Sequence, residues 1–567
     1  MAVSRCRHYI LWAKIFAPMF FRVTRAGPYQ YLQIARSHRD GKTVRQQTLL
    51  SLGRLDVLQG SGQLDALLRS GLRLCERLTV VDAHAAGKTE PVALRRIGPD
   101  LVFSRLWEQS GIQRCLLQEL EGRRYEFSVE RAIYLTVLHR LFASGSDRAA
   151  ERWREQYRIA GTEELDLHHL YRAMAFLGGP VDDEKATVLG SPRCIKDRIE
   201  EALFERRRDL FSEVDLVFFD TTSIYFEGQG GESLGQYGHS KDSRPDLRQM
   251  IVGLVLDVGG WPICCEMWPG NTTDVKTLVP VVERLKGRFR VREMCVLADR
   301  GMISDQTLAA FESSDPPVRY ILGARMRRQK EVSQKVLTQR GAWREIHPER
   351  IRNKDPAPLK VKEVRIENRR YIVCLNEEER RHDAKVREAI VEHLREQLKR
   401  GDKSLVGNKG YRRFLKVAGE SHFTVDEARV KEDARFDGVW VLRTNTDLEN
   451  EVVAISYKNL WMVEDLFRTT KSILETRPIY HKCDETIRGH VFCSFLALLL
   501  KADLEKRLRE RDGAWEWAEI IRGLDNLQEV EARFQGRRFF LRSQLVGQAH
   551  QAIRAGGVAV PPTIREA

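Results

Sequence analysis

Residues 457–474 read Tyr457-Lys-Asn-Leu-Trp-Met-Val-Glu-Asp-Leu-Phe-Arg-Thr-Thr-Lys-Ser-Ile-Leu474 and contain neither glycine nor proline. Their apolar residues recur at helical spacing, which predicts one uninterrupted amphipathic helix. A second stripe, built at steps of three and four residues, lies beside the apolar one. It holds Tyr457, Trp461, Glu464, Arg468 and Lys471. The helix is therefore expected to present a carboxylate flanked by aromatic rings and two cations.

On its own this helix has a simpler interpretation. Glu464 and Arg468 are four residues apart and would form an ordinary solvated ion pair on a surface helix. Two aspartates upstream favour a different interpretation: Asp220 ends the apolar run that starts at Asp215, and Asp299 directly follows the apolar run 294–298. Because a single aspartate at a strand end commonly caps a turn, the case depends on all three carboxylates occurring together.

The order of the elements around the two aspartates predicts the fold. Beyond the run that contains Asp220, we expect strands at 249–257, 262–267, 294–298 and 320–324 and helices at 277–286 and 304–313. Three antiparallel strands, a helix and two strands around a second helix are the order of a ribonuclease H-like core. The predicted fold is therefore α/β, with a mixed five-stranded sheet and flanking helices. In such a sheet Asp220 and Asp299 lie on adjacent central strands, and the Glu464 helix packs across the same edge.

Three converging carboxylates have the chemistry of a magnesium site, because acidic oxygens are the ligands that Mg²⁺ prefers. Two ions about 4 Å apart would clamp the attacking and leaving oxygens of an in-line phosphoryl transfer. We expect Asp220 to bridge both ions, Asp299 to bind one and Glu464 the other, with Mn²⁺ able to substitute for Mg²⁺. Water would be the nucleophile for strand cleavage and a 3′-hydroxyl for joining, so no side chain needs to become covalently attached.

Composition favours a partner rich in negative charge. The 567 residues are 42% hydrophobic and 31% charged, as in folded globular proteins, with a net charge of +14 and a pI near 9.3. Nucleic acid is the simplest such partner, and no lipidation motif supports the rival, an anionic membrane. The ten cysteines show no zinc or disulfide spacing, and no segment is long and apolar enough to span a membrane. We expect a cytoplasmic protein that associates with chromosomal DNA.

Changes in sequence texture divide the chain into regions. Short helices with serine or aspartate N-caps are expected between 96 and 210 and suit a DNA-binding region. Residues 1–18 are expected to come from a start codon placed too far upstream. The other expected regions are a β-rich region with a hairpin and a linker at 19–95, the helical region at 96–210, the first part of the core at 211–325, an insertion domain at 326–436, the second part of the core at 437–505, and a helical end at 506–567.

The residues also carry a resemblance to a known family. The chain resembles the DDE transposases of bacterial insertion sequences, in the branch that has a β-rich insertion before the last acidic residue. The matching segments are Phe218-Phe-Asp220-Thr-Thr-Ser, Gly238-His-Ser-Lys-Asp-Ser-Arg-Pro-Asp246-Leu, Pro269-Gly-Asn271-Thr-Thr-Asp274, Leu297-Ala-Asp299-Arg-Gly-Met-Ile-Ser and 457–471. The resemblance implies cut-and-paste transposition by a homodimer that binds double-stranded DNA, namely the terminal inverted repeats of an element and a target.

That branch carries a Tyr, Arg, Glu, Lys signature on its last helix. Tyr457, Glu464 and Lys471 match it, but Leu460 stands where the family has arginine. The departure puts one DNA contact in doubt and leaves the metal site intact, and Lys458 or Arg468 is a candidate to supply the missing charge.

Seven residues are candidates for DNA contact. Lys471, two helical turns from Glu464, is expected to hold the phosphate next to the cleaved bond, whereas Arg468 either pairs with Glu464 or contacts DNA. Tyr457 either stacks on an unpaired base or packs. The polar basic loop with His239, Lys241 and Arg244 suits phosphate contacts. His490, on the next helix, either contacts DNA or is a buried polar residue.

Three functions remain open on the sequence. The leading one is a transposase that cleaves and joins DNA strands with two Mg²⁺ ions. The second is a ribonuclease H-like nuclease or resolvase that cuts without joining. The third is an inactive DNA-binding protein descended from a transposase, which the intact set of Asp220, Asp299 and Glu464 argues against.

Overall fold

The computed structural model describes residues 19–40, 43–64, 67, 90–181, 192–208, 215–291, 294–302, 304–347, 357–400, 413–418, 422–472, 474, 476–511, 513–534 and 537–566. The chain forms two units. The smaller comprises Met1–Leu94, Val530–Arg542 and Pro561–Ala567, and the larger comprises Arg95–Glu529 and Ser543–Val560.

A nine-stranded mixed sheet lies at the centre of the larger unit, in the order β10-β11-β12-β15-β9-β8-β5-β6-β7. Within it β5 pairs in parallel with β8 and antiparallel with β6, while β9 is parallel to β8 and β7 antiparallel to β6. The strands predicted in this region are therefore confirmed. Their bounds are β5 Asp215–Tyr225, β6 Gln249–Leu256, β7 Pro262–Pro269, β8 Met294–Ala298 and β9 Arg319–Gly323.

β5 runs without interruption, although a break was expected after Asp220. Thr221, Thr222 and Ser223 pair with β6 and continue the ladder, because β-branched and small hydroxyl side chains fit a pleated strand. Asp220 is therefore inside a strand and not at its end. Phe219 pairs with Ala298 in the parallel register of β5 and β8, so the next residues along the two strands are Asp220 and Asp299.

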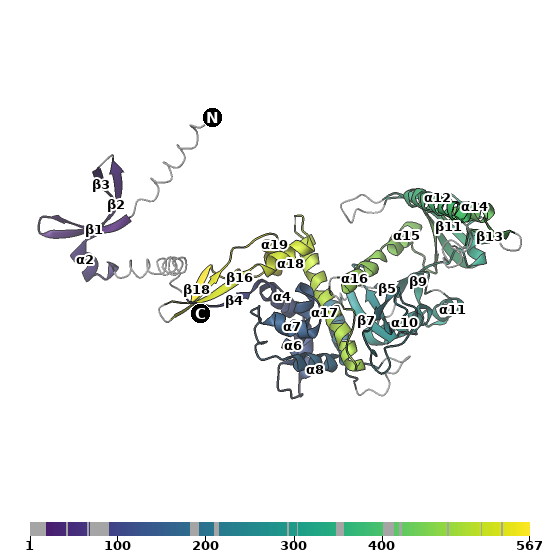
Figure 1. The fold of residues 1–567 in the computed structure, drawn as a ribbon, viewed down its shortest axis with the longest axis horizontal. Coiled ribbons are helices and arrows are strands. Elements are labelled where there is room, and N and C mark those ends of the chain that lie inside the picture. The colour runs from purple at the N-terminus through teal and green to yellow at the C-terminus, as the bar shows by residue number, and fades with distance from the viewer. Residues whose placement is uncertain are drawn as a thin grey trace. The chain divides into compact units, whose positions relative to one another are not determined.

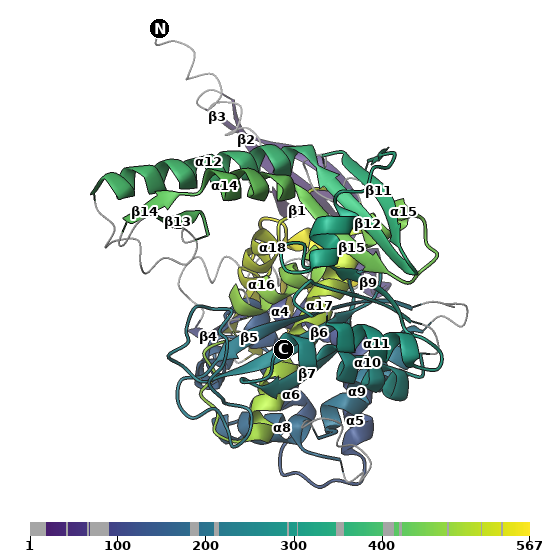
Figure 2. The same ribbon diagram turned by 90° about the vertical axis from the view of Figure 1, so that its right-hand side faces the viewer.

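The insertion extends the core sheet, whereas a separate domain beside a five-stranded sheet was expected. β15 (Val439–Thr444) pairs antiparallel with β9, and β12 (Arg369–Asn376), β11 (Leu359–Ile366) and β10 (Arg344–Ile346) follow in turn. Figure 2 shows β11, β12, β15 and β9 side by side. An edge strand offers unpaired backbone groups, and β15 satisfies those of β9. The insertion also carries α12 (Glu377–Arg400), β13 (Leu415–Ala418), β14 (His422–Val425) and α14 (Glu427–Asp433).

Helices cover both faces of this sheet (Figure 1). α10 (Leu278–Phe289) and α11 (Asp305–Ser313) share a buried apolar cluster with Phe219 of β5. α16 (Trp461–Ser472) and α17 (Asp484–Arg509) share another with Phe218. Since successive side chains of a strand point to opposite faces, Asp220 lies on the face of Phe218, toward α16.

The helix predicted over 457–474 is interrupted. α15 (Asn450–Lys458) ends before α16 begins, and between them Leu460, Met462 and Val463 donate to carbonyls three residues back instead of four. Neither glycine nor proline causes this tightening. Tertiary contacts accompany it, because the Tyr457 hydroxyl binds Asp299 and Leu460 packs against the core. The single stripe expected for one helix is therefore divided between two helices.

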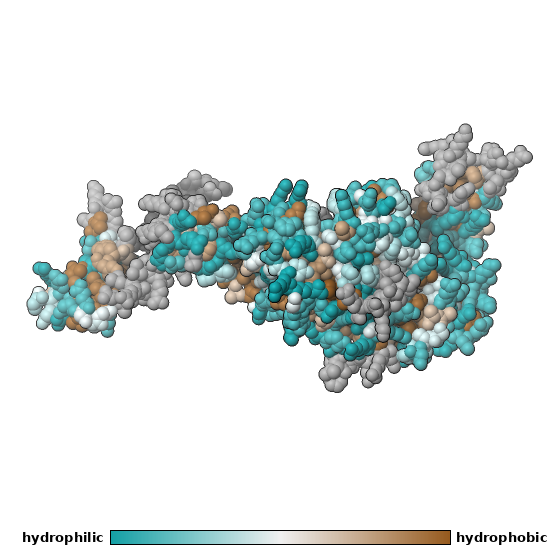
Figure 3. Space-filling model, turned by 90° about the horizontal axis from the view of Figure 1, so that it is seen from below, coloured by the Kyte–Doolittle hydropathy of each residue, from teal (hydrophilic) through white to brown (hydrophobic). Residues whose placement is uncertain are grey.

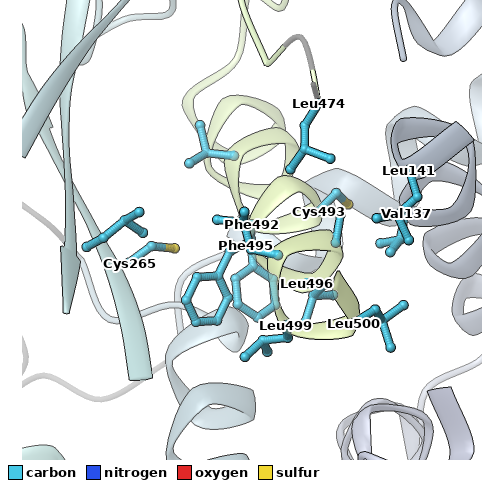
Figure 4. Close-up of a cluster of buried hydrophobic side chains, with 14 of the residues drawn as sticks. Val137, Leu141, Cys265, Leu474, Phe492, Cys493, Phe495, Leu496, Leu499 and Leu500 are labelled. Carbon is cyan, nitrogen blue, oxygen red and sulfur yellow. The ribbon is translucent and has the colours of Figure 1, made fainter. Parts of the chain in front are cut away.

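The helices expected between 96 and 210 pack around α17. Ser128 and Ser146 accept the N-cap hydrogen bonds of α6 and α7 as predicted. α17 is buried on every side from Ile487 to Leu500, as expected for a helix at the centre of a core. Figure 4 shows α17 with Val137 and Leu141 of α6 on one side and Cys265 of β7 on the other. The bounds are α4 Gly98–Gln109, α5 Ile112–Leu120, α6 Val129–Phe142, α7 Asp147–Arg154, α8 Leu167–Gly178 and α9 Ile195–Arg207.

The two ends of the chain contain more strand than expected. In the smaller unit β1, β2 and β3 form the predicted antiparallel strands, while the turn predicted at Asp40-Gly41 and residues 1–18 lie outside the described residues. Only helices were expected over 506–567, but alternating apolar residues there form strands, and Ile564–Glu566 pairs with β17 where a frayed end was expected. The bounds are β1 Met19–Ala26, β2 Tyr29–Asp40, β3 Thr43–Arg54, α2 Leu55–Gly60, β4 Glu90–Arg96, α18 Trp517–Asp525, β16 Gln528–Phe534, β17 Arg537–Arg542, α19 Ala549–Gly556 and β18 Ile564–Glu566.

Hydrophilic residues predominate on the face of the protein in Figure 3, with hydrophobic ones scattered among them. None of the helices in the described part of the chain has the length and apolar character needed to cross a membrane.

The crossing of α8 and α17 provides a test of the scaffold. Gly489→Ala is expected to lower the free energy of unfolding by about 1–3 kcal/mol, since a Cβ there would lie 1.9 Å from the Met174 carbonyl oxygen and force the helices apart. Urea unfolding followed by circular dichroism measures the change.

Gly287→Ala is the matched control, because a Cβ at this α10 position meets nothing within 4 Å. It is expected to raise the free energy of unfolding by about 0.5–1 kcal/mol. Equal effects of the two substitutions would contradict the close crossing of α8 and α17.

Candidate active site

Three acidic residues from three elements line one cavity of about 260 Å³ in the larger unit. Asp220 comes from β5, Asp299 directly follows β8, and Glu464 lies in the first turn of α16. The cavity thus brings together the carboxylates that the sequence singled out. Its other lining residues are Glu379, Trp440, Tyr457, Lys458, Leu460 and Trp461.

Asp220 is the most buried of the three carboxylates. Burial raises the pKa of Asp220 to about 6. This value includes smaller upward contributions from the Asp299 and Asp274 carboxylates, because like charges disfavour ionisation, and downward ones from Lys241 and from the Thr221 N–H, which donates to Asp220 Oδ1 at 2.7 Å. Asp220 therefore lies where a cation would relieve both its desolvation and the repulsion from its neighbours.

Tyr457 is fixed beside Asp299. Its hydroxyl donates to Asp299 Oδ1 at 3.1 Å, and burial raises the pKa of Tyr457 well above its usual range. Gly323 of β9 makes room for it, since a Cβ at that position would lie 2.2 Å from the Tyr457 hydroxyl oxygen. Of the two roles expected for Tyr457, the packed one is present in this DNA-free protein.

Glu464 does not pair with Arg468. Among the described residues no hydrogen bond or ion pair of the Glu464 carboxylate is present, and its side chain is exposed to the cavity. Arg468 lies 3.7 Å from Asp465 and is 70% exposed. The simple surface ion pair is therefore absent, and Arg468 is open to solvent.

Leu460 stands at the arginine position of the resembling family and lines the cavity while packing against the core. Lys458 lines the same cavity. Of the two candidates for the missing charge, Lys458 therefore lies at the site and Arg468 does not line it.

The loop with His239, Lys241 and Arg244 lies over the end of β5. The Lys241 ammonium group donates to the Thr221 carbonyl at 2.7 Å and lies 3.2 Å from Asp274, so this cation is tied to the catalytic strand. Arg244 pairs with Asp246 at 2.8 Å and is 43% exposed. His239 is exposed. Of the three side chains, His239 and Arg244 are the more accessible to a phosphate.

Lys471 is bound inside the protein. Its ammonium group donates to Asp242 Oδ1 at 2.7 Å, and Arg477 lies 2.6 Å from Asp242 Oδ2. Burial lowers the pKa of Lys471. The phosphate contact expected of Lys471 is therefore occupied by a carboxylate in this structure.

His490 is buried and holds the scaffold, so we remove it from the DNA-contacting residues. Its Nε2 faces the Thr476 carbonyl at 3.1 Å, while its Nδ1 lies 2.9 Å from Arg140 and 3.1 Å from His481. Asp147, His481 and His490 lie close enough to hold a metal ion together. Since the Arg140 guanidinium and the hydrogen bonds already use both ring nitrogens of His490, the cluster is better suited to joining helices.

Several residues near the site escaped the sequence analysis. Glu379 belongs to the insertion and Trp440 to β15, and their contact with the core depends on long-range strand pairing that no local pattern encodes. Asp274, expected to shape a turn, accepts a hydrogen bond from Thr221 Oγ1 at 2.7 Å. Asp242 contacts both Lys471 and Arg477, and no local pattern in the sequence indicated that these segments meet.

The donor set fits a hard divalent cation. Asp220, Asp299 and Glu464 offer carboxylate oxygens and no sulfur or imidazole, which suits Mg²⁺ or Mn²⁺ and not zinc. Burial and the neighbouring carboxylates disfavour the charged form of Asp220, and a bound cation would offset this cost.

Comparison with known proteins gives two family matches. The family described as "Transposase DDE domain" matches residues 213–500, just over half of the chain, and the family described as "IS1634 family transposase, N-terminal domain" matches residues 21–85. No curated protein matches the sequence. A solved structure titled "Cryo-EM structure of piggyBac transposase synaptic complex with hairpin DNA" is 11% identical, with a TM-score of 0.36 over 75% of this chain and 77% of the other. This likeness is too distant for a comparison of residues.

The raised pKa of Asp220 predicts a pH-dependent stability. The folded protein holds the proton of Asp220 more tightly than the unfolded chain, so stability is lost as pH rises from about 4 through about 6. At pH 8 without metal, Asp220→Asn should therefore be more stable than the original protein by up to about 3 kcal/mol in free energy of unfolding, and it should unfold at a higher temperature. The difference should vanish near pH 4. Differential scanning calorimetry measures both.

Glu283→Gln, at an exposed position of α10, serves as the control and should change stability little at either pH. A destabilised Asp220→Asn protein at pH 8 would contradict the desolvated carboxylate.

Proposed function

The chain belongs to the Transposase DDE domain family, and from that premise we propose that Asp220, Asp299 and Glu464 hold two Mg²⁺ ions for cleavage and joining of DNA strands. The chain is a transposase and acts on DNA. The observation that carries the proposal is the single cavity lined by all three carboxylates. Mn²⁺ would substitute for Mg²⁺, since both take oxygen ligands.

The residues of the chain have separate tasks in this proposal. Asp220 on β5 would be shared by the two ions, and Asp299 and Glu464 would each hold one of them. When bound, the two ions activate the attacking oxygen and stabilise the leaving oxygen of an in-line phosphoryl transfer. Tyr457 orients Asp299 through its hydrogen bond, and burial of Asp220 keeps bulk water away from its carboxylate.

We propose that these residues stand on a ribonuclease H-like core. The five strands β7-β6-β5-β8-β9 support it, since only β6 is antiparallel to β5, whereas β7, β8 and β9 run parallel to it. The sequence predicted this arrangement, in which β5 pairs antiparallel with one neighbour and parallel with the other. The three insertion strands β10, β11 and β12, together with β15, lie beyond β9 and leave that order unchanged.

The DNA partners in this proposal are the terminal inverted repeats of the element and a target duplex, held by a homodimer on paired ends. The net charge of +14 supports phosphate binding. The helical region 96–210 contributes exposed arginines to phosphate binding. The proposed DNA contacts near the three carboxylates are still Arg468, Lys471, His239, Lys241 and Arg244. The exposed arginines of the helical region include Arg123, Arg124, Arg148, Arg152 and Arg172.

The three carboxylates are each expected to be essential for chemistry and dispensable for DNA binding. Asp220→Asn, Asp299→Asn and Glu464→Gln should each lower the rate of strand cleavage by at least about 10³-fold, because loss of a metal position removes several kcal/mol of transition-state stabilisation. The assay uses purified protein, Mg²⁺ and duplexes with the sequences that flank this gene, and resolves nicked and joined products on denaturing gels.

Glu283→Gln is the matched control and should cleave normally. Joined products identify a transposition reaction, and cleavage without joining would favour the nuclease alternative. Tight binding without cleavage by the original protein would favour the inactive DNA-binding alternative, and normal cleavage by any of the three variants would refute the site.

Metal stoichiometry can be measured without DNA. Calorimetric titration with Mn²⁺ at pH 8 should give two bound ions per chain, and affinity should fall steeply as pH drops below about 6, since Asp220 is protonated there. Asp220→Asn should lose both ions and Glu464→Gln one. An unchanged stoichiometry in Asp220→Asn would contradict the bridging role.

A further inference from the structure

One carboxylate in the larger unit binds two cations at once. Asp242, in the loop between β5 and β6, accepts from Lys471 Nζ at 2.7 Å through one oxygen and lies 2.6 Å from Arg477 through the other. Lys471 ends α16, and Arg477 lies in the segment that leads to α17. Three segments distant in sequence thus meet at a single anion.

The arrangement has one positive charge in excess. Asp242 is 8% exposed, Lys471 14% and Arg477 27%, so the three groups are largely withdrawn from water. Removing two cations from water for a single carboxylate costs more than it does for a balanced pair, unless a further anion joins them. The excess positive charge therefore keeps these two cations attractive to another anion.

The geometry suits a phosphate group. A carboxylate whose two oxygens each contact a cation resembles the two non-bridging oxygens of a phosphodiester. Lysine and arginine are also the side chains with which proteins bind phosphate. Asp242 is thus a stand-in for a phosphodiester between Lys471 and Arg477.

The site lies on the path of a strand bound at the cavity. Lys471 follows Glu464 by seven residues on α16, which corresponds to about 10 Å along the helix. Phosphates of one strand follow each other at about 3.4 Å along a duplex axis, so the site is about three nucleotides from the metal positions. A strand bound at the carboxylates would pass Lys471 and Arg477.

We propose that Lys471 and Arg477 form a clamp for a DNA phosphodiester, and that Asp242 occupies this clamp in the DNA-free protein and is displaced when DNA binds. This inference rests on the proposed function for the direction of the strand, but not on the metal ions. In this proposal Arg477 is a DNA-binding residue. Asp242 competes with the DNA phosphate for Lys471 and Arg477, and so weakens the binding of a duplex that makes no other contacts with the protein.

A purely structural role for Asp242 predicts the opposite result. As an anchor, Asp242 would tie the loop to α16, and its removal would loosen the loop and weaken DNA binding. As a competitor, its removal would free two cations and strengthen binding. The sign of the change in affinity therefore separates the two roles.

The test measures DNA binding in EDTA, where no cleavage occurs and the metal proposal is not involved. Fluorescence anisotropy with a labelled duplex that carries the flanking sequence of this gene gives the dissociation constant at salt concentrations from about 50 to about 300 mM. Asp242→Asn should bind about 10-fold tighter at 150 mM salt with nearly the same log–log salt slope, since the same cation–phosphate contacts form in both complexes and only the internal competitor is lost.

Two comparisons control the experiment. Asp503→Asn removes one carboxylate from a similarly buried ion pair with Arg507 on α17 and makes the same change in net charge, so it should leave the slope unchanged. Arg477→Gln should weaken binding several-fold and make the slope shallower by about 0.9, and it should cancel the gain of Asp242→Asn in the double variant.

Weaker or unchanged binding by a folded Asp242→Asn protein would overturn the proposal, as would a gain that Asp503→Asn reproduces. If Asp242→Asn fails to fold, Arg477→Gln decides alone, and an unchanged slope in that variant overturns the proposal.

Discussion

The parallel pairing of β5 with β8 is the constraint on which the site depends. Its register sets Phe219 opposite Ala298, so Asp220 and Asp299 follow as neighbours at one edge of a buried sheet. Two carboxylates so placed repel each other, and burial adds to the cost of ionising Asp220. A fold that keeps such an arrangement gains from a cation held between them. The surrounding elements, from α16 to the Tyr457 hydroxyl, maintain this costly geometry.

The scaffold that holds α16 explains why so much of the chain is helical. α17 is buried on all sides by α4, α6, α8 and the sheet, and the segment that joins it to α16 is fixed by the hydrogen bonds of His490 and Arg140. α16 in turn packs on β5 through Phe467. The position of Glu464 relative to Asp220 is therefore set by the whole helical core, because no local contact of Glu464 fixes it.

Local patterns in the sequence predicted the elements that carry the site, but not their long-range connections. The apolar runs located β5, β6, β7, β8 and β9, and Ser128 and Ser146 located two helix starts, since these signals are short in range. The break between α15 and α16 follows from tertiary contacts of Tyr457 and Leu460, and the sheet pairing of the insertion joins strands far apart in the chain. Asp242 had an ordinary loop sequence, and only its two partners reveal its role.

The continuous hydrogen bonding from β10 to β7 has a mechanical consequence. Because β15 and the insertion strands share one sheet with the catalytic strands, the part of the cavity wall formed by Trp440 of β15 cannot swing away from the carboxylates as a hinged lid would. If the cavity wall does not move, the DNA duplex has to change shape instead. Bending a duplex costs on the order of 1–6 kcal/mol over a short site, so a helix of DNA that enters this cavity is the component that must kink or unstack. Preference among sequences would then arise from how easily each one bends as well as from which bases are touched.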